Sequence, residues 1–148
     1  MDKQALVGRR GEGERLAVGG GAVTLQVTSE HSDGGLTLIE YEVPAGFPGP
    51  PLHVHAFDEL FYVLDGELAF RLGDDAVTLG AGGHVYAPGN HPHTFSNPSG
   101  EPARMLVVTS PGGFEGFFRA VAAATVEGQI PDPATMARLN AEYGVTLA

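Results

Sequence analysis

Short apolar segments recur along most of the chain, with turn-forming residues between them. Segments 22–28 and 36–43 alternate apolar and polar residues, so that Ile39, Tyr41 and Val43 fall on one face of a strand. The other segments that predict strands are 59–64, 67–72, 76–79, 84–87, 93–97 and 103–109. Many short strands separated by turn residues are typical of an all-β sandwich or barrel.

Two neighbouring segments are joined by a specific turn signal. Asp65 and Gly66 lie between segments 59–64 and 67–72. An Asp-Gly pair between β-prone segments favours a type I′ turn, in which both central residues have positive φ. We therefore predict that these two segments form a β-hairpin.

The pattern changes after the last of these segments, where three phenylalanines recur with helical spacing. Asp132 and Pro133 have the residue types of a helix N-cap and of the first helical position, and Gly144 predicts the end of that helix. We therefore expect a single domain over 1–148, with a barrel over about 22–110 and C-terminal helices over about 113–143.

Composition narrows the fold class further. The chain has 22 glycines and 11 prolines in 148 residues, which is well above average usage and argues against a helical bundle or a coiled coil. Hydrophobic residues make up 43% and charged residues 18%, a balance that argues against disorder. These proportions support one folded β domain.

Charge and targeting features limit the partners. Eight basic and 18 acidic residues give a formal net charge of −10, which disfavours nucleic acid and anionic membranes as partners. The chain has no cysteine, so disulfides, thiolate metal sites and cysteine nucleophiles are excluded. Residues 1–15 alternate charge with glycine, and we expect them to be solvated and mobile, with no signal sequence. No apolar stretch of membrane-spanning length occurs, so we expect a cytoplasmic protein.

Two histidine pairs have a spacing that suits metal binding. His53 and His55, like His91 and His93, stand two residues apart, so the rings of each pair project from the same face of a strand. Glu59 shares the parity of His55 if the chain stays extended. Two imidazoles and a carboxylate suit Fe, Mn, Ni, Cu, Co or Zn better than Ca or Mg. The spacing leaves both His91 and His93 open as a further ligand.

The residues around these histidines form two longer motifs. The first reads HxHxxxE from His53 to Glu59, followed by six residues and Gly66. The second, with spacings Gx5P, Px4H and Hx3N, consists of Gly82, Pro88, His93 and Asn97. These motifs resemble the two motifs of the cupin superfamily, G(x)5HxH(x)3–4E(x)6G and G(x)5PxG(x)2H(x)3N. The chain is most similar in type to small single-domain cupins that resemble quercetin dioxygenases.

The resemblance has implications for the fold and for the metal ligands. It implies a double-stranded β-helix, or jelly-roll barrel, with a short helical C-terminus. It also implies one divalent transition metal bound by His53, His55, Glu59 and His93. Four protein ligands leave one or two positions open, as in a catalytic metal site. Two motif glycines are replaced, by Phe47 and Asn90, which concerns the loops and not the ligands.

Aromatic and apolar residues near these positions are candidates for a substrate pocket. Phe61 has the parity of Glu59, and Phe95 has that of His93. The further candidates are Tyr41, Phe47, Phe57 and Met105. An apolar pocket with a few polar groups is usual for a small-molecule site.

The resemblance favours a metal-dependent oxygenase or dioxygenase that acts on a small phenolic, enol or diketone-like substrate. It assigns Glu59 a second role, as a catalytic base toward a substrate hydroxyl. Cupins perform many reactions, so a metal-assisted isomerase, decarboxylase or lyase is an alternative, and a non-enzymatic binding or sensing protein is another. The resemblance also implies a homodimer.

Overall fold

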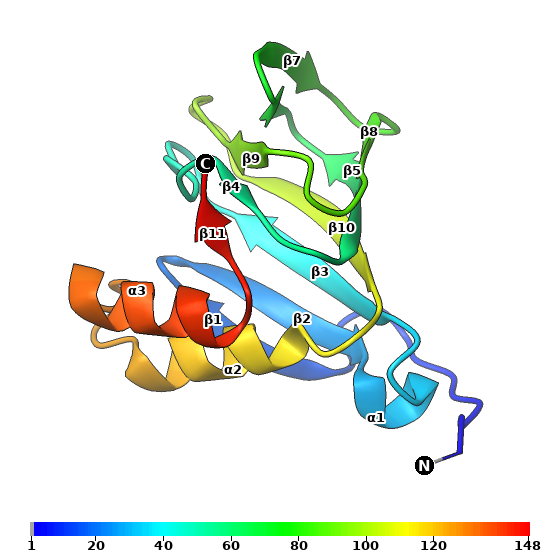
Figure 1. Cartoon of the computed structure of the whole chain (residues 1–148). Helices are drawn as coiled ribbons and strands as arrows, with labels where there is room; N and C mark the ends of the chain where they lie inside the picture. Colours follow the sequence, from blue (N-terminus) through cyan, green and yellow to red (C-terminus); the bar gives the residue numbers. More distant parts are fainter. Residues whose placement is uncertain (1) are drawn as a thin grey trace.

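The strands form two antiparallel sheets that pack face to face (Figure 1). The computed structural model describes residues 2–148. The six-stranded sheet has the order β1 (Glu14–Val18), β2 (Gly21–Val27), β3 (Thr37–Val43), β10 (Ala103–Ser110), β5 (Asp58–Asp65) and β8 (His84–Ala87). The five-stranded sheet has the order β11 (Thr146–Leu147), β4 (His53–Val54), β9 (His93–Ser96), β6 (Leu68–Leu72) and β7 (Asp75–Leu79). Each segment predicted to be a strand contains one, and the all-β barrel is confirmed.

The interior of the barrel follows from the alternation of side chains along the strands. In β3, the buried positions are Thr37, Ile39, Tyr41 and Val43, which is the face that the sequence pattern predicts. In β10, the buried positions are Ala103, Met105, Val107 and Thr109. Because successive side chains of a strand point to opposite faces, these two strands line the interior of the barrel with every second residue.

The predicted hairpin at Asp65 and Gly66 is wrong. Strand β5 pairs with β10 and β8, whereas β6 pairs with β7 and β9, so the two segments belong to different sheets. Gly66 has a positive φ of 75°, but Asp65 does not have the positive φ that a type I′ turn also requires. The backbone of Gly66 instead passes against Pro102 and Ala103 at the start of β10. The turn therefore carries the chain from one sheet to the other.

The sheets extend further along the chain than the predicted barrel over 22–110. Strand β1 begins at Glu14 and pairs with β2, so the end of the segment expected to be mobile is ordered. The guanidinium of Arg15 donates two hydrogen bonds to Glu42, which fixes β1 across the sheet. Sequence alternation misses β1 because its burial does not alternate, and it misses β4 and β11 because each has only two residues.

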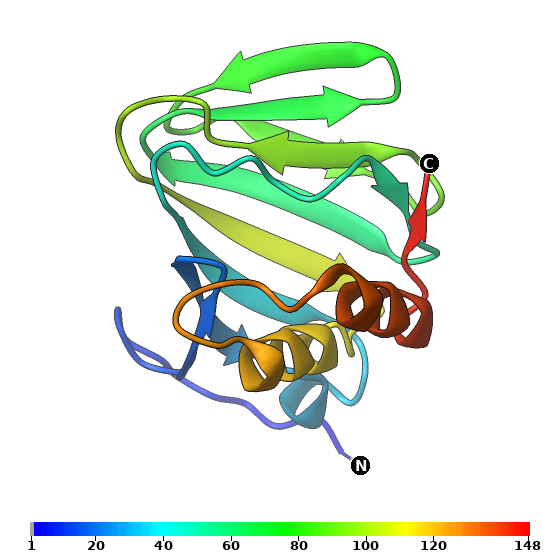
Figure 2. The same ribbon diagram turned by 90° about the vertical axis from the view of Figure 1, so that its left-hand side faces the viewer.

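Two C-terminal helices, α2 (Glu115–Ala124) and α3 (Pro133–Glu142), lie side by side near β1 and β2, far from β7 (Figures 1 and 2). The predicted N-cap is confirmed, since the Asp132 side chain accepts a hydrogen bond from the backbone N–H of Thr135. Phe118 of α2 and Leu139 of α3 join the buried core of the barrel. A further short helix, α1 (Ser29–Ser32), follows β2. No helix within residues 2–148 is long and apolar enough to span a membrane.

The Pro- and Gly-rich segment 44–51 packs closely against β9. Asn97 donates its backbone N–H to the carbonyl of Phe47, and the Thr94 hydroxyl donates to the carbonyl of Pro50. Gly49 has a φ of +75°, and a Cβ at this position would lie 1.8 Å from the carbonyl oxygen of Phe95. The close approach of the two backbones therefore requires glycine at position 49.

We expect Gly49→Ala to destabilise the protein much more than Gly46→Ala. Gly46 has a similar φ, +71°, but a Cβ at this position would have nothing within 4 Å, so the Gly46 variant carries the backbone strain without the clash. The clash at Gly49 adds about 1–3 kcal/mol to the loss of unfolding free energy. Urea denaturation of both variants measures the difference, and equal losses would contradict the close packing.

A buried carboxylate anchors α2 to the barrel. Glu115 is 3% exposed, and it accepts hydrogen bonds from the Ser29 backbone and hydroxyl, from the Thr37 hydroxyl (2.6 Å) and from the Gly113 N–H. Desolvation raises the pKa of this carboxyl, but the hydrogen bonds from Ser29 and Thr37 outweigh it and hold the pKa below the ordinary value of 4.5. The charged form of Glu115 therefore stabilises the fold.

We expect Glu115→Gln to lower the unfolding free energy at pH 7 by about 1–3 kcal/mol, since the new amide N–H₂ faces donors. A depressed folded-state pKa contributes stability above the unfolded-state pKa, and this contribution disappears as the pH falls through the folded-state value. The wild type should therefore lose its advantage over the variant as the pH is lowered below about 4.5. Denaturation at several pH values measures this, with the exposed Glu67→Gln as control; a pH-independent difference would contradict it.

Candidate metal centre

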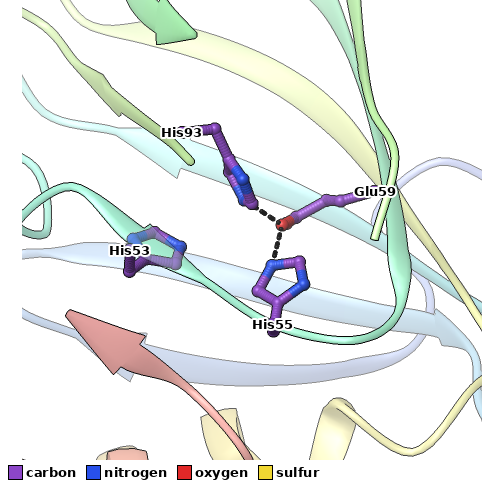
Figure 3. Close-up of side chains that lie close together, drawn as sticks. All are labelled: His53, His55, Glu59 and His93. Atoms are coloured by element: carbon purple, nitrogen blue, oxygen red, sulfur yellow. Dashed lines mark hydrogen bonds and ion pairs between the residues drawn. The ribbon is translucent and has the colours of Figure 1, made fainter. Parts of the chain in front are cut away.

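Three histidines and one glutamate converge between the two sheets (Figure 3). His53 lies on β4, His93 lies opposite it on β9, and His55 follows β4 directly. Glu59 lies on β5, in the other sheet. One ligand atom from each of the four residues lies within 4.8 Å of the others. The chain bends between His55 and Glu59, so the carboxylate approaches the histidines from the opposite sheet and not along an extended strand, as shared parity would require.

Backbone carbonyl groups hold each of the three imidazole rings. Nδ1 of His53 lies 2.8 Å from the Pro51 carbonyl oxygen, and Nδ1 of His93 lies 2.8 Å from that of His91. Nδ1 of His55 lies 2.9 Å from the carbonyl oxygen of Phe57. Because a carbonyl oxygen can only accept, each Nδ1 carries the hydrogen, and each neutral ring keeps a lone pair on Nε2. This is the tautomer that metal-binding histidines need, with the opposite nitrogen anchored by the protein.

The atoms that meet at the centre are all acceptors. Nε2 of His55 lies 2.9 Å from Oε1 of Glu59, and Nε2 of His93 lies 3.0 Å from the same oxygen. With Nδ1 protonated on both rings, neither neutral histidine can donate to the carboxylate. Such contacts require a cation, which is either a second proton on a ring or a metal ion. The chemistry of these four residues therefore fits a bound transition metal.

Desolvation and hydrogen bonding shift the pKa values of the cluster in opposite directions. Desolvation raises the pKa of Glu59, but hydrogen bonds with His55 and His93 outweigh it and lower the pKa below 4.5. Desolvation lowers the pKa of His93, but the hydrogen bond to Glu59 outweighs it and raises the pKa above 6.5. For His53, desolvation prevails and lowers the pKa below the ordinary value of 6.5. A proton and a metal ion therefore compete for the space between His93 and Glu59.

His91 and His93, which spacing leaves open as alternatives, occupy different environments in the structure. His93 is 2% exposed and lies in the cluster, whereas the side chain of His91 is exposed. His91 contributes only its backbone carbonyl, as the acceptor for Nδ1 of His93.

Of the predicted pocket residues, Phe57 and Phe61 lie beside the cluster. The ring of Phe57 stacks on His55 with centroids 3.7 Å apart, and Phe61 lies 6.0 Å from His93. Phe95 lies one ring further away, 6.2 Å from Phe61. Tyr41 and Phe47 contact Phe95, and Met105 is fully buried in the core. A substrate-binding role for these six residues stays a prediction.

Sequence reasoning misses one aromatic neighbour of the centre. Phe114, just before α2, lies 4.9 Å from Phe57 and 6.1 Å from His55 between ring centroids. Its helical spacing with Phe117 and Phe118 indicates only a packing face. No local signal shows that the turn after β10 brings this ring to the histidines.

We expect His93→Ala to weaken Co²⁺ binding by more than the roughly 10–100-fold that loss of an outer-shell partner costs. His91→Ala is the matched control, because it removes an exposed ring and keeps the carbonyl group that holds His93. Titration of Co²⁺ into both variants and elemental analysis of the loaded proteins measure the difference. Equal losses in the two variants, or none in either, would contradict the assignment.

The chain also resembles known proteins. Residues 39–109 match the family model described as a cupin domain. Quercetin 2,3-dioxygenase of Bacillus subtilis is 30% identical over 112 residues, which cover 75% of this chain and 33% of that protein. Dimethylsulfoniopropionate lyase DddQ of Ruegeria pomeroyi is 38% identical over 68 residues, which cover 42% of this chain and 33% of that protein. The chain thus spans about a third of the length of these two relatives.

Solved structures agree on the fold. The crystal structure of the same DddQ matches with a TM-score of 0.53 and 28% identity, covering 61% of this chain and 46% of that chain. An RmlC-like cupin from Shewanella frigidimarina matches with a TM-score of 0.66 and 17% identity, covering 78% of this chain and 99% of that chain, which supports the fold alone. With the family model, the motifs and the two-sheet barrel in agreement, residues 39–109 form a cupin domain, and the chain resembles quercetin-dioxygenase-like proteins.

Proposed function

We propose that this cupin is a metal-dependent dioxygenase that acts on a small phenolic, enol or diketone-like substrate. The observation that carries the proposal is the convergence of four acceptor atoms, from His53, His55, Glu59 and His93, in the barrel interior. The likeness to quercetin 2,3-dioxygenase supports the reaction type. The proposed cofactor is one divalent transition ion.

The residues of the cluster and the aromatic rings beside it have separate roles in such a reaction. When bound, a divalent ion with three neutral imidazoles and one carboxylate supplies a Lewis acid of net single positive charge that stabilises an anionic substrate oxygen. His55, Glu59 and His93 are buried, so this charge acts in a medium that screens it poorly. The rings of Phe57 and Phe61 lie against His55 and His93 and give the cluster an apolar border.

Glu59 has a second proposed role, as the base that takes a proton from the substrate hydroxyl. The contacts of its carboxylate with His55 and His93 both end on Oε1, which leaves Oε2 as the oxygen that can receive the proton. Proton removal makes the substrate an oxyanion, the form that the centre binds best.

We expect the full chain, loaded with Fe²⁺, Mn²⁺, Co²⁺ or Ni²⁺ in turn, to consume O₂ in proportion to a supplied flavonol or β-diketone. An oxygen electrode combined with chromatography of the substrate measures this. Glu59→Gln should lower kcat per bound metal by about 10²–10⁴-fold, the usual contribution of a general base. Stoichiometric metal and substrate binding without turnover would contradict the proposal and favour a binding or sensing role.

A metal-assisted lyase is a second candidate, favoured by the match to dimethylsulfoniopropionate lyase DddQ over 68 residues. A lyase, an isomerase and a decarboxylase all convert their substrates without consuming O₂. Turnover that continues under nitrogen would therefore favour this group over the dioxygenase. A homodimeric state and a cytoplasmic location also remain proposals, and sedimentation velocity of the purified chain tests the first.

A further inference from the structure

Thr109 carries a hydroxyl group that the folded chain leaves without a partner. The residue is 0% exposed, and its Oγ1 is the one buried side-chain nitrogen or oxygen among residues 2–148 that has no hydrogen-bond partner. The other inward positions of β10 are Ala103, Met105 and Val107, which are all apolar. Because an unpaired buried hydroxyl is unfavourable, we expect the Thr109 hydroxyl to need a hydrogen-bond acceptor inside the barrel.

Strand register places this hydroxyl beside the metal centre. Thr109 pairs directly with Glu59 on β5 and, on its other side, with Thr37 on β3. Directly opposed residues of antiparallel strands have Cβ atoms about 4.5–5.5 Å apart and project from the same face. Thr37, Thr109 and Glu59 therefore form one row across the interior of the six-stranded sheet.

The two neighbours of Thr109 in this row, Thr37 and Glu59, differ in whether they have a free hydrogen-bond acceptor. The hydroxyl of Thr37 donates to Glu115 and accepts from the backbone N–H of Gly113, so it is already engaged. Glu59 uses Oε1 for both histidines, and no hydrogen bond ends on its Oε2 within the described part of the chain. The acceptor that remains in the row is Oε2 of Glu59.

We propose that Thr109 is a positioning residue for Glu59, and that its hydroxyl donates a hydrogen bond to Oε2 of that carboxylate. The contact forms by rotation of the two side chains or through one bridging water. It holds Oε1 toward the histidines and gives the buried charge a donor on its other side, which strengthens it as a ligand. The inference rests on the proposed metal centre but not on the dioxygenase reaction.

Two variants of Thr109 separate this role from packing. Thr109→Val keeps the shape and removes the hydroxyl, whereas Thr109→Ser keeps the hydroxyl and removes the methyl group. The full chain, stripped of metal, is titrated with Co²⁺, and the dissociation constant, the visible absorption spectrum of the bound Co²⁺ and the Tm of the metal-free protein are measured. None of these readouts depends on turnover.

We expect the two variants to affect different readouts, Thr109→Val the binding of Co²⁺ and Thr109→Ser the Tm. Thr109→Val keeps the shape of the packed side chain, so it should lower the Tm of the metal-free protein no more than Thr109→Ser does. It loses the donor to Oε2 of Glu59, so it should bind Co²⁺ about tenfold more weakly and with an altered spectrum. Thr109→Ser should lower the Tm and bind Co²⁺ as the wild type does. Wild-type affinity and spectrum in Thr109→Val, or equal weakening in both variants, would overturn it.

Two further outcomes separate this proposal from the proposed function. A wild-type chain that fails to bind Co²⁺ would overturn both, because Glu59 would then have no metal to ligate. A wild type that binds Co²⁺ but never consumes O₂ would overturn the dioxygenase alone, while the Thr109 variants would still decide the positioning role.

Discussion

Four acceptor atoms are held close together inside this barrel, and their mutual repulsion is the constraint on which the site depends. The Nε2 atoms of His55 and His93 lie 2.9 and 3.0 Å from Oε1 of Glu59. The Nδ1 hydrogen of each ring is already donated to a backbone carbonyl. Only a positive charge between them makes the arrangement favourable. The arrangement therefore requires a cation, which is either a metal ion or an added proton.

The four residues of the cluster come from both sheets of the barrel. His53 and His93 are paired across β4 and β9, and Glu59 reaches them from β5. The Nδ1 anchors are backbone carbonyls two residues from each histidine, so the ring orientation follows from the local backbone and not from other side chains. The close backbone contact between Gly49 and Phe95 keeps segment 44–51 against β9, near His93. The site is thus positioned mainly by main-chain geometry.

The sequence predicts well those features that depend on local pattern. Strands with one buried face, such as β3 and β10, are recognisable because alternation of apolar residues follows burial directly. The Asp132 cap is recognisable because its hydrogen bond is made three residues away. The motifs predict three of the residues that converge in the cluster, His53, His55 and Glu59, and the resemblance to cupins adds His93, which spacing alone does not separate from His91.

What the sequence does not predict are the features set by tertiary pairing. The Asp65-Gly66 turn has hairpin residues, yet β5 and β6 find their partners in different sheets. Strands β4 and β11 are too short to show a periodic pattern, although β4 carries His53 of the cluster. Thr109 gives one signal, a polar residue at an inward position of an apolar strand, but its place opposite Glu59 needs the register.

Anomalous diffraction from crystals of the Co²⁺-loaded protein tests the metal centre most directly. We predict one strong cobalt peak, about 2.0–2.2 Å from Nε2 of His53, His55 and His93 and from a carboxylate oxygen of Glu59. A peak bound elsewhere, or an ordered cluster with no peak after loading, would contradict a metal centre built from these four residues.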